Sequence, residues 1–231
     1  MTEGMKMYRE VPHERLVKTY VSEGFYNREE NRKFLEETGS GEVEILSDHV
    51  FGMAADTKTP QGILCLVRQM QYGLSDLLEE ENPLLLLLED IQDPGNLGTI
   101  FRTAEGAGVT GIIMSSQTAD IYNPKTVRST MGSLYRMPFL RVKEFEGILQ
   151  ELKKRKIRTY AAHLEGSVNY TAADYTKGSA FMIGNEGNGL SEKMASKADA
   201  YIKIPMCGQL ESLNAAVAAA ILMYEARRQR S

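Results

Sequence analysis

Residues 205–225 read PMCGQLESLNAAVAAAILMYE, a polar loop that runs directly into a stretch of small and aliphatic side chains. From Ala215 to Met223 every residue is alanine or aliphatic, which predicts a helix buried close to other backbone. Ser212 is a suitable N-cap, because its hydroxyl can accept from N–H groups that the first helical turn leaves unpaired. Polar residues at the mouth of a buried helix are also well placed to hold a ligand. The segment therefore predicts either an ordinary capped core helix or one wall of a site.

The sequence before this helix alternates strand-like and helix-like segments. Aliphatic runs bounded by turn residues predict strands at Leu84–Leu88, Gly111–Ser115, Phe139–Val142, Thr159–Ala162, Ala180–Gly184 and Ile202–Pro205. Helices are predicted at 97–107, 124–131, 144–155, 191–197 and 212–229. Because the strands are aliphatic on both faces, we predict a mostly parallel sheet covered on both sides by helices. This α/β domain is expected to span residues 84–231.

A smaller α/β unit is predicted over residues 1–70. Its expected elements are strands at Leu16–Val21, Val43–Leu46 and Ile63–Val67 and an exposed helix at Arg28–Glu37. Only a short polar segment precedes Leu16, so we expect this unit to be incomplete at its start. Residues 71–83 end in three glutamates, Asn82 and Pro83, which is typical of a solvated connector.

Composition excludes several classes of protein. The chain has 231 residues, a net charge of -4 and 42% hydrophobic residues, which suits a globular protein. No apolar run approaches the about 20 residues of a membrane span, and the polar N-terminus predicts no signal peptide. Two cysteines and three histidines without metal-ligand spacing predict neither a disulfide framework nor a metal site. We therefore expect a cytoplasmic protein without a membrane partner or a metal.

One motif points to a nucleotide-binding function that its context contradicts. Residues 106–111 match G-x-G-x-x-G, the dinucleotide fingerprint. That fingerprint binds pyrophosphate only when a strand precedes it and a helix follows. Here the predicted helix comes first and the strand Gly111–Ser115 follows, so these glycines are better explained as a helix C-cap and a tight turn.

Three segments of the larger domain carry polar residues at strand ends or helix starts. Asn96 and Arg102 follow the strand Leu84–Leu88, Glu186 lies in a glycine-rich loop, and Ser212 and Asn214 precede the last helix. Asn96 is itself a plausible N-cap. Each segment alone is weak evidence, since Arg102 could form a surface pair with Glu105 and glycine-rich loops are common. No Ser-His-Asp, Cys-His or metal set competes with the three together.

The spacing of these segments is specific. N-L-G-x-x-x-R at Asn96–Arg102, G-N-E-G-x-G at Gly184–Gly189 and I-P-M-x-G-x-x-E-S-L-N at Ile204–Asn214 resemble, in order and register, the three motifs of the SpoU/TrmH branch of the SPOUT RNA methyltransferases. The segment 59–63 resembles the ribosomal L30e-like RNA-binding domain that often precedes this catalytic domain. The resemblance implies a sheet with a C-terminal deep trefoil knot, and a homodimer with its active site near the interface.

The resemblance further implies an S-adenosylmethionine cofactor and methyl transfer to a ribose 2′-hydroxyl of ribosomal or transfer RNA. The implied cofactor pocket is built largely from backbone and is lined by Leu164, Gly184, Asn185, Gly187, Ile204, Met206 and Leu213. The glycines would let backbone approach an adenine or ribose closely.

The implied catalytic residues are Arg102, Asn96, Glu186, Ser212 and Asn214. A guanidinium stays charged in proteins, so we expect Arg102 to hold a phosphate and stabilise developing alkoxide charge rather than remove a proton. Asn96 and Asn214 would orient Arg102 or the ribose, Glu186 would anchor Arg102 or the substrate, and Ser212 would fix its loop. Two alternatives stay open: a base methyltransferase of the same fold, and a catalytically silent RNA-binding protein.

Overall fold

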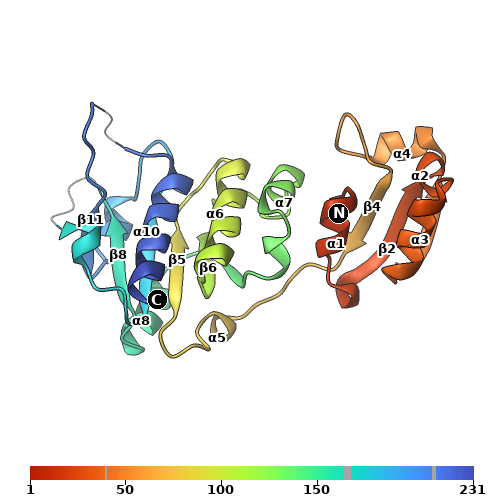
Figure 1. Cartoon of the computed structure of the whole chain (residues 1–231). Helices are drawn as coiled ribbons and strands as arrows, with labels where there is room; N and C mark the ends of the chain where they lie inside the picture. Colours follow the sequence, from red (N-terminus) through yellow and green to blue (C-terminus); the bar gives the residue numbers. More distant parts are fainter. Residues whose placement is uncertain (40, 164–167, 210–211) are drawn as a thin grey trace.

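A computed structural model of the chain describes residues 1–39, 41–163, 168–209 and 212–231. These residues form two sheets, one in an N-terminal unit and one in a larger C-terminal unit (Figure 1). The smaller sheet has the strand order β1-β4-β2-β3, and the larger has the order β7-β6-β5-β10-β8-β11-β9.

The N-terminal unit covers residues 2–67. Its elements are β1 (Thr2–Glu3), α1 (Met5–Glu10), η1 (His13–Arg15), β2 (Leu16–Ser22), α2 (Glu23–Tyr26), α3 (Glu29–Glu37), β3 (Val43–Leu46), α4 (Asp48–Ala54) and β4 (Ile63–Val67). β4 is antiparallel to both β1 and β2, and β3 is parallel to β2. The segment before Leu16, read from sequence as merely polar, thus adds a strand and a helix. Met7 and Tyr8 of that helix are buried.

The larger unit alternates strands and helices as predicted, but residues 71–83, expected to be a solvated connector, contain the helix α5, whose Leu77 is buried. Its elements are α5 (Leu74–Leu77), β5 (Leu84–Leu88), α6 (Pro94–Ala107), β6 (Gly111–Ser115), α7 (Pro124–Thr130), η2 (Ser133–Tyr135), β7 (Phe139–Val142), α8 (Glu146–Lys154), β8 (Arg158–Ala162), β9 (Val168–Asn169), η3 (Tyr170–Ala172), β10 (Ser179–Ile183), α9 (Glu192–Ala195), β11 (Ala200–Lys203) and α10 (Ala215–Gln229). Its strand pairs are parallel throughout the described residues, which confirms the predicted parallel sheet.

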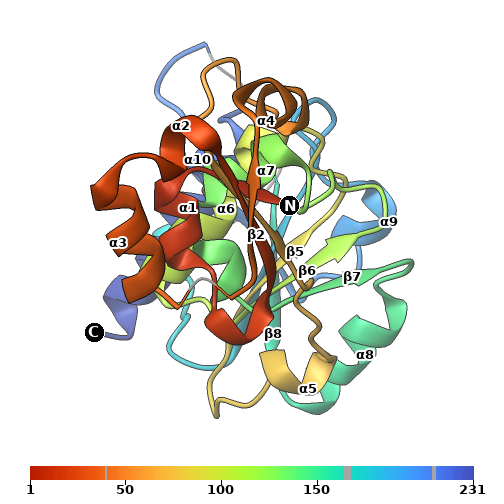
Figure 2. The same cartoon turned by 90° about the vertical axis from the view of Figure 1, so that its right-hand side faces the viewer.

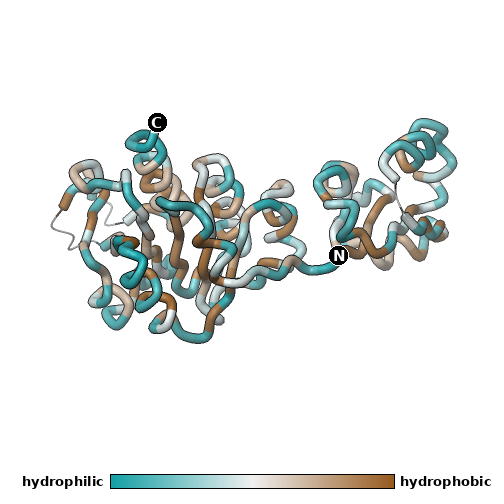
Figure 3. Tube along the Cα trace, turned by 90° about the horizontal axis from the view of Figure 1, so that it is seen from below, coloured by the Kyte–Doolittle hydropathy of each residue, from teal (hydrophilic) through white to brown (hydrophobic). Residues whose placement is uncertain are grey.

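β5 occupies the interior of the sheet, between β6 and β10. Its five leucines are at most 1% exposed because helices cover both faces. Leu84, Leu86 and Leu88 belong to the core that includes α6 and α10, whereas Leu85 and Leu87 belong to the core under α5, α8 and α9. This alternation is the period of two expected of a strand, and the apolar strands run through the middle of the unit in Figure 3.

The helix ends correct two sequence predictions. Asp93, not Asn96, is the N-cap of α6, and its side chain accepts from the backbone N–H of Asn96. Asn214, not Ser212, is the N-cap of α10, and its Oδ1 accepts from the first turn. The expected C-cap glycine is confirmed: Gly108 has a φ of 77° in the left-handed region and ends α6 before β6.

Ion pairs and a shared core join the two units. Arg128 of α7 lies 2.5 Å from Asp56, and Arg136 contacts both Glu10 of α1 and Glu105 of α6. The buried side chains of α1, β2 and β4 continue into the core that contains β5 and α6. In Figure 2 the N-terminal unit lies in front of the larger one.

Across the described ranges, no helix is both long enough and apolar enough to cross a membrane.

Candidate active site

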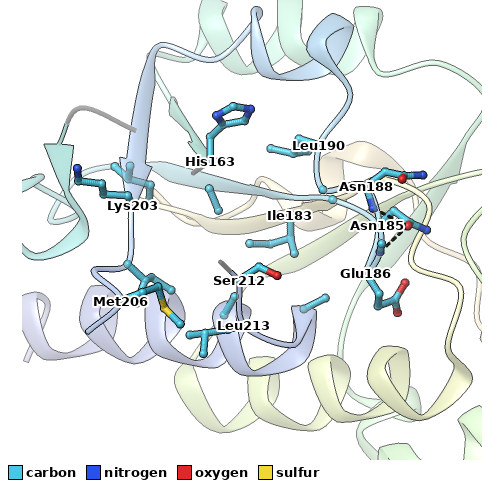
Figure 4. A pocket seen from close by; sticks show the side chains of 18 of the residues that line it. His163, Ile183, Asn185, Glu186, Asn188, Leu190, Lys203, Met206, Ser212 and Leu213 are labelled. Carbon is cyan, nitrogen blue, oxygen red and sulfur yellow. Dashed lines mark hydrogen bonds between the residues drawn. The ribbon is translucent and has the colours of Figure 1, made fainter. Parts of the chain in front are cut away.

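A cavity of about 600 Å³ opens at the carboxyl ends of β8, β10 and β11, beside the start of α10. Ligands of open parallel sheets bind at this edge. The loop after β10 forms one wall, and the segments after β11 and before α10 form another (Figure 4). Glu186, Asn185 and Asn188 lie at one end of the cavity, and Lys203 and Met206 lie toward the other.

Most residues expected at a cofactor site line this cavity. These are Gly184, Asn185, Gly187, Ile204, Met206 and Leu213, together with Glu186 and Ser212 from the predicted catalytic set. Leu164, also predicted for the cofactor, lies outside the described residues. Sequence reasoning missed His163, Leu190 and Lys203, which also contribute to the lining.

Glu186 connects the glycine-rich loop to the start of α6. Its carboxylate accepts from the backbone N–H groups of Gln92 (3.1 Å) and Asp93 (3.2 Å). It also accepts from Nδ2 of Asn96 at 2.9 Å. Three donors therefore converge on one carboxylate, and none of them belongs to Arg102.

These contacts determine the charge of Glu186. Partial burial alone would raise its pKa, but the hydrogen bonds from Asn96, Gln92 and Asp93 outweigh it and hold the pKa below its ordinary value. Glu186 is therefore ionised at neutral pH and a poor proton acceptor, which suits an anchoring role better than a general base.

Asn96 extends the connection to the third segment. Because its Nδ2 donates to Glu186, its Oδ1 is available as an acceptor, and Nδ2 of Asn214 donates to it at 2.9 Å. The Oδ1 of Asn214 in turn accepts from the N–H groups of Ala216 and Val217 at the start of α10. Three predicted catalytic residues thus form one hydrogen-bonded chain across all three segments.

The glycine-rich loop is closed by its own backbone. Asn185 and Gly189 exchange two backbone hydrogen bonds of 3.0 and 2.9 Å. A Cβ at Gly184 would lie 2.1 Å from the carbonyl carbon of Gly189, so loop closure itself requires glycine there. At Gly187 the nearest atom to such a Cβ is 3.4 Å away, and at Gly189 no atom lies within 4 Å, so the backbone at these two glycines leaves room for close approach of a ligand.

Arg102 is exposed on α6 and does not line the cavity. Among the described residues it has no hydrogen-bond or ion-pair partner. The surface pair with Glu105 that the sequence allowed is not formed, because Arg136 occupies that carboxylate. Within the part of the chain that the structure describes, the guanidinium of Arg102 is therefore not engaged by another side chain.

Two further carboxylates at this edge escaped the sequence analysis. Glu89 accepts from Ser191, and Asp90 accepts from Ser115 and offers its backbone carbonyl to Asn185. The available signal was an acidic pair directly after a strand of five leucines. Within the part of the chain that the structure describes, no cluster of three His, Cys, Asp or Glu side chains could hold a metal ion.

Comparison with known proteins gives consistent matches. The model of the SpoU rRNA Methylase family matches residues 83–224. The 23S rRNA (guanosine(2553)-2'-O)-methyltransferase RlmP of Bacillus subtilis (strain 168) is 36% identical over 183 residues, which span 79% of this chain and 71% of that protein.

Solved structures match nearly the whole chain. The SpoU methyltransferase AviRb from Streptomyces viridochromogenes, in complex with the cofactor AdoMet, superposes with a TM-score of 0.88 at 28% identity, covering 99% of this chain and 89% of AviRb. The AdoMet-bound rRNA methyltransferase from Sinorhizobium meliloti has a TM-score of 0.81 at 31% identity, covering 98% and 86%.

Proposed function

The chain belongs to the SpoU rRNA methylase family, and from that membership we propose that it transfers a methyl group from S-adenosylmethionine to a ribose 2′-hydroxyl of RNA. The observation that carries this is the cavity of about 600 Å³, whose walls come from the glycine-rich loop and from the segment leading into α10. The relatives with solved structures include proteins bound to AdoMet.

The cavity fits this cofactor. Its volume lies within the range of about 300–1,000 Å³ usual for small-molecule sites. Ile183, Ile204 and Leu213 supply apolar contacts, and the backbone of residues 184–190 supplies polar groups. When bound, the cofactor supplies a methyl group already activated on a sulfonium sulfur. The chain has to place the acceptor ribose in line and assist the loss of its proton, and alignment alone contributes several kcal/mol.

Arg102 is proposed to contact the RNA. Its exposed guanidinium has no partner among the described residues, so it is free to bind a phosphate with two parallel hydrogen bonds. The same donors would stabilise negative charge that develops on the 2′-oxygen.

The chain of Glu186, Asn96 and Asn214 is proposed to position the site. It fixes the distance between the glycine-rich loop, α6 and α10. α6 carries Arg102 and α10 borders the cavity, so this chain sets the separation between the RNA-binding group and the cofactor. Ser212 lines the cavity and would fix the third segment.

Ribosomal RNA is the proposed substrate class, supported by the relative named for 23S rRNA, and the cytoplasm is then the expected location. The N-terminal unit is proposed to bind RNA as L30e-like domains do. The C-terminal segment is proposed to form the trefoil knot typical of SPOUT proteins.

The active form is proposed to be a homodimer. Val217 and Tyr224 on α10 are 47% and 53% exposed, and they lie two helical turns apart on one side of the helix. Tyr224 reaches across to Gly106 of α6, so this apolar surface adjoins the helix that carries Arg102. Light scattering should give twice the chain mass, and Tyr224→Asp should reduce it to a single chain.

Transfer of labelled methyl from S-adenosylmethionine to separated 23S rRNA, 16S rRNA and bulk tRNA, followed by alkaline digestion, tests the function. Alkali cleaves only next to a free 2′-hydroxyl, so we expect label in alkali-resistant dinucleotides from ribosomal RNA. Label in mononucleotides would show base methylation and contradict the role of Arg102. No label, together with no binding of cofactor, would indicate a silent RNA-binding protein.

A further inference from the structure

The two residues that follow β5 hold both ends of the glycine-rich loop. The backbone N–H of Glu89 donates to the carbonyl of Ile183 at 2.9 Å, which extends the pairing of β5 with β10 by one residue. Glu89 and Asp90 thus stand beside the point where the loop 184–190 begins. The proposed mechanism gives neither of them a role.

Glu89 holds the far end of the loop. One carboxylate oxygen accepts from the backbone N–H of Ser191 at 2.7 Å, and the other accepts from the hydroxyl of Ser191 at 2.7 Å. The Ser191 hydroxyl also caps α9 by accepting from Met194 at 3.1 Å. A single carboxylate therefore fixes both the backbone and the side chain of the residue that ends the loop.

Asp90 holds the near end. Its backbone carbonyl accepts from Nδ2 of Asn185 at 2.8 Å. Asp90 has a φ of 57°, a left-handed conformation that is costly for most residues but tolerated by Asp. Ser115 stabilises that conformation, since its hydroxyl donates to the Asp90 carboxylate at 2.6 Å and accepts from the Asp90 backbone at 2.9 Å.

Glu89 lies near two lysines but forms its hydrogen bonds with Ser191. Glu89 shares a shallow depression with Lys193 and Lys197, yet these lysines pair with Glu144 and Glu146. An exposed ion pair with lysine would contribute little. Glu89 instead accepts hydrogen bonds from Ser191, the residue directly after the loop 184–190 that lines the cavity. Its carboxylate therefore holds the end of this loop and does not form a surface ion pair.

We propose that Glu89 is a positioning residue for the cofactor: it sets the end of the loop 184–190 and thereby the shape of the cavity wall. The inference rests on the proposed function, since it presumes that the cavity holds S-adenosylmethionine. Residues 184–190 all line the cavity, so a loop released at Ser191 would lose its fit to the ligand.

Calorimetric titration of the full chain with S-adenosylhomocysteine tests the inference. Glu89→Ala should raise the dissociation constant about tenfold, because two charge-assisted hydrogen bonds are lost. The dissociation constant of Glu89→Gln should stay within about threefold of that of the unchanged protein, since the glutamine amide can accept from the Ser191 N–H and donate to the Ser191 hydroxyl. Glu144→Ala, which removes a carboxylate from the same depression, should bind like the unchanged protein.

Kinetics separate positioning from general damage. Glu89→Ala should raise the KM for S-adenosylmethionine about tenfold and leave kcat at saturating cofactor within about twofold. A loss of folded enzyme would instead lower kcat at unchanged KM. If Glu89→Ala does not fold, Ser191→Ala provides a second variant. It loses the hydroxyl's hydrogen bond to Glu89 together with the cap of α9, and we expect its dissociation constant to rise about threefold.

The outcomes are distinct. Equal affinity of Glu89→Ala and the unchanged protein would overturn the inference while leaving the proposed function intact. A Glu89→Gln variant as weak as Glu89→Ala would overturn the hydrogen-bonding basis. Failure of the unchanged protein to bind S-adenosylhomocysteine would contradict the proposed function, and the inference with it.

Discussion

Any side chain at Gly98 of α6 is predicted to destabilise the fold, because α6 and α7 approach each other closely there. A Cβ at this position would lie 2.4 Å from Cβ of Ser129 and 2.9 Å from the carbonyl oxygen of Thr126. Both distances are shorter than the contacts that Cβ atoms make in proteins. The Thr126 oxygen belongs to the backbone, so it cannot move aside by a change of rotamer. Gly98→Ala therefore forces the two helices apart.

The expected magnitude follows from two opposing effects. Alanine in a helix interior is favoured over glycine by roughly 0.5–1 kcal/mol. Overpacking of this kind costs about 1–3 kcal/mol. We expect Gly98→Ala to be destabilised by about 1–2 kcal/mol, which corresponds to a fall in Tm of about 3–6 °C for a chain of this size.

Thermal unfolding followed by circular dichroism measures the effect, and α8 offers a matched control. Gly147 is also helical, but a Cβ there would meet nothing within 4 Å. Gly147→Ala should leave Tm unchanged or raise it by about 2 °C. Adding Ser129→Gly to Gly98→Ala removes the closest atom, so the two changes should couple favourably by about 1 kcal/mol.

A Gly98→Ala variant with the Tm of the unchanged protein would refute the reasoning, because it would mean that α6 and α7 are not in close contact. So would a double variant whose loss equals the sum of the two single losses.

Further predictions concern the site and the thiols. Arg102→Lys should lower kcat about a hundredfold, because a lysine cannot make the two parallel hydrogen bonds to a phosphate; near-normal turnover would exclude that role. Asn214→Ala should destabilise the chain by about 1 kcal/mol, because the N-cap of α10 is lost. Asn214→Asp should keep this cap and lose only the hydrogen bond donated to Asn96. Equal urea midpoints for the two variants would contradict the role of Asn214 as the cap. Burial raises the pKa of the Cys65 thiol to about 12, while Cys207 is exposed, so a thiol reagent at pH 8 should label one cysteine before unfolding and two after; two rapidly labelled thiols in the folded protein would contradict the burial of Cys65.

Sequence predicted the sheet well where the signal is local. Val43–Leu46, Ile63–Val67, Leu84–Leu88, Gly111–Ser115 and Phe139–Val142 match observed strands residue for residue, because each is an apolar or branched run closed by turn residues. The helix Met5–Glu10 was not predicted, because its sequence is mostly charged and polar. Its two buried side chains, Met7 and Tyr8, pack against residues that are distant in sequence.

The N-caps of α6 and α10 could not be predicted from the local sequence alone. Asn96 and Ser212 are both suitable caps, but Asp93 and Asn214 take these positions. The choice depends on contacts between distant segments: the side chain of Asn96 is drawn to Glu186, 90 residues away. The same limit applies to Glu89, whose partner Ser191 is 102 residues away, so only the fold reveals the contact.

The leucine strand has a consequence for synthesis of the chain. Leu84–Leu88 pairs with β10, whose first residue, Ser179, is translated about 95 residues later. At about 5–20 residues per second, one edge of the most apolar strand in the nascent polypeptide waits about 5–20 s for its neighbour. Five consecutive leucines without charge are a hazard for aggregation during that interval. The acidic run and Pro83 before the strand, and Glu89 and Asp90 after it, are gatekeepers of the kind that oppose self-association. The Glu89 carboxylate, proposed to shape the cavity in the finished protein, thus also places a negative charge beside the strand before its neighbour exists.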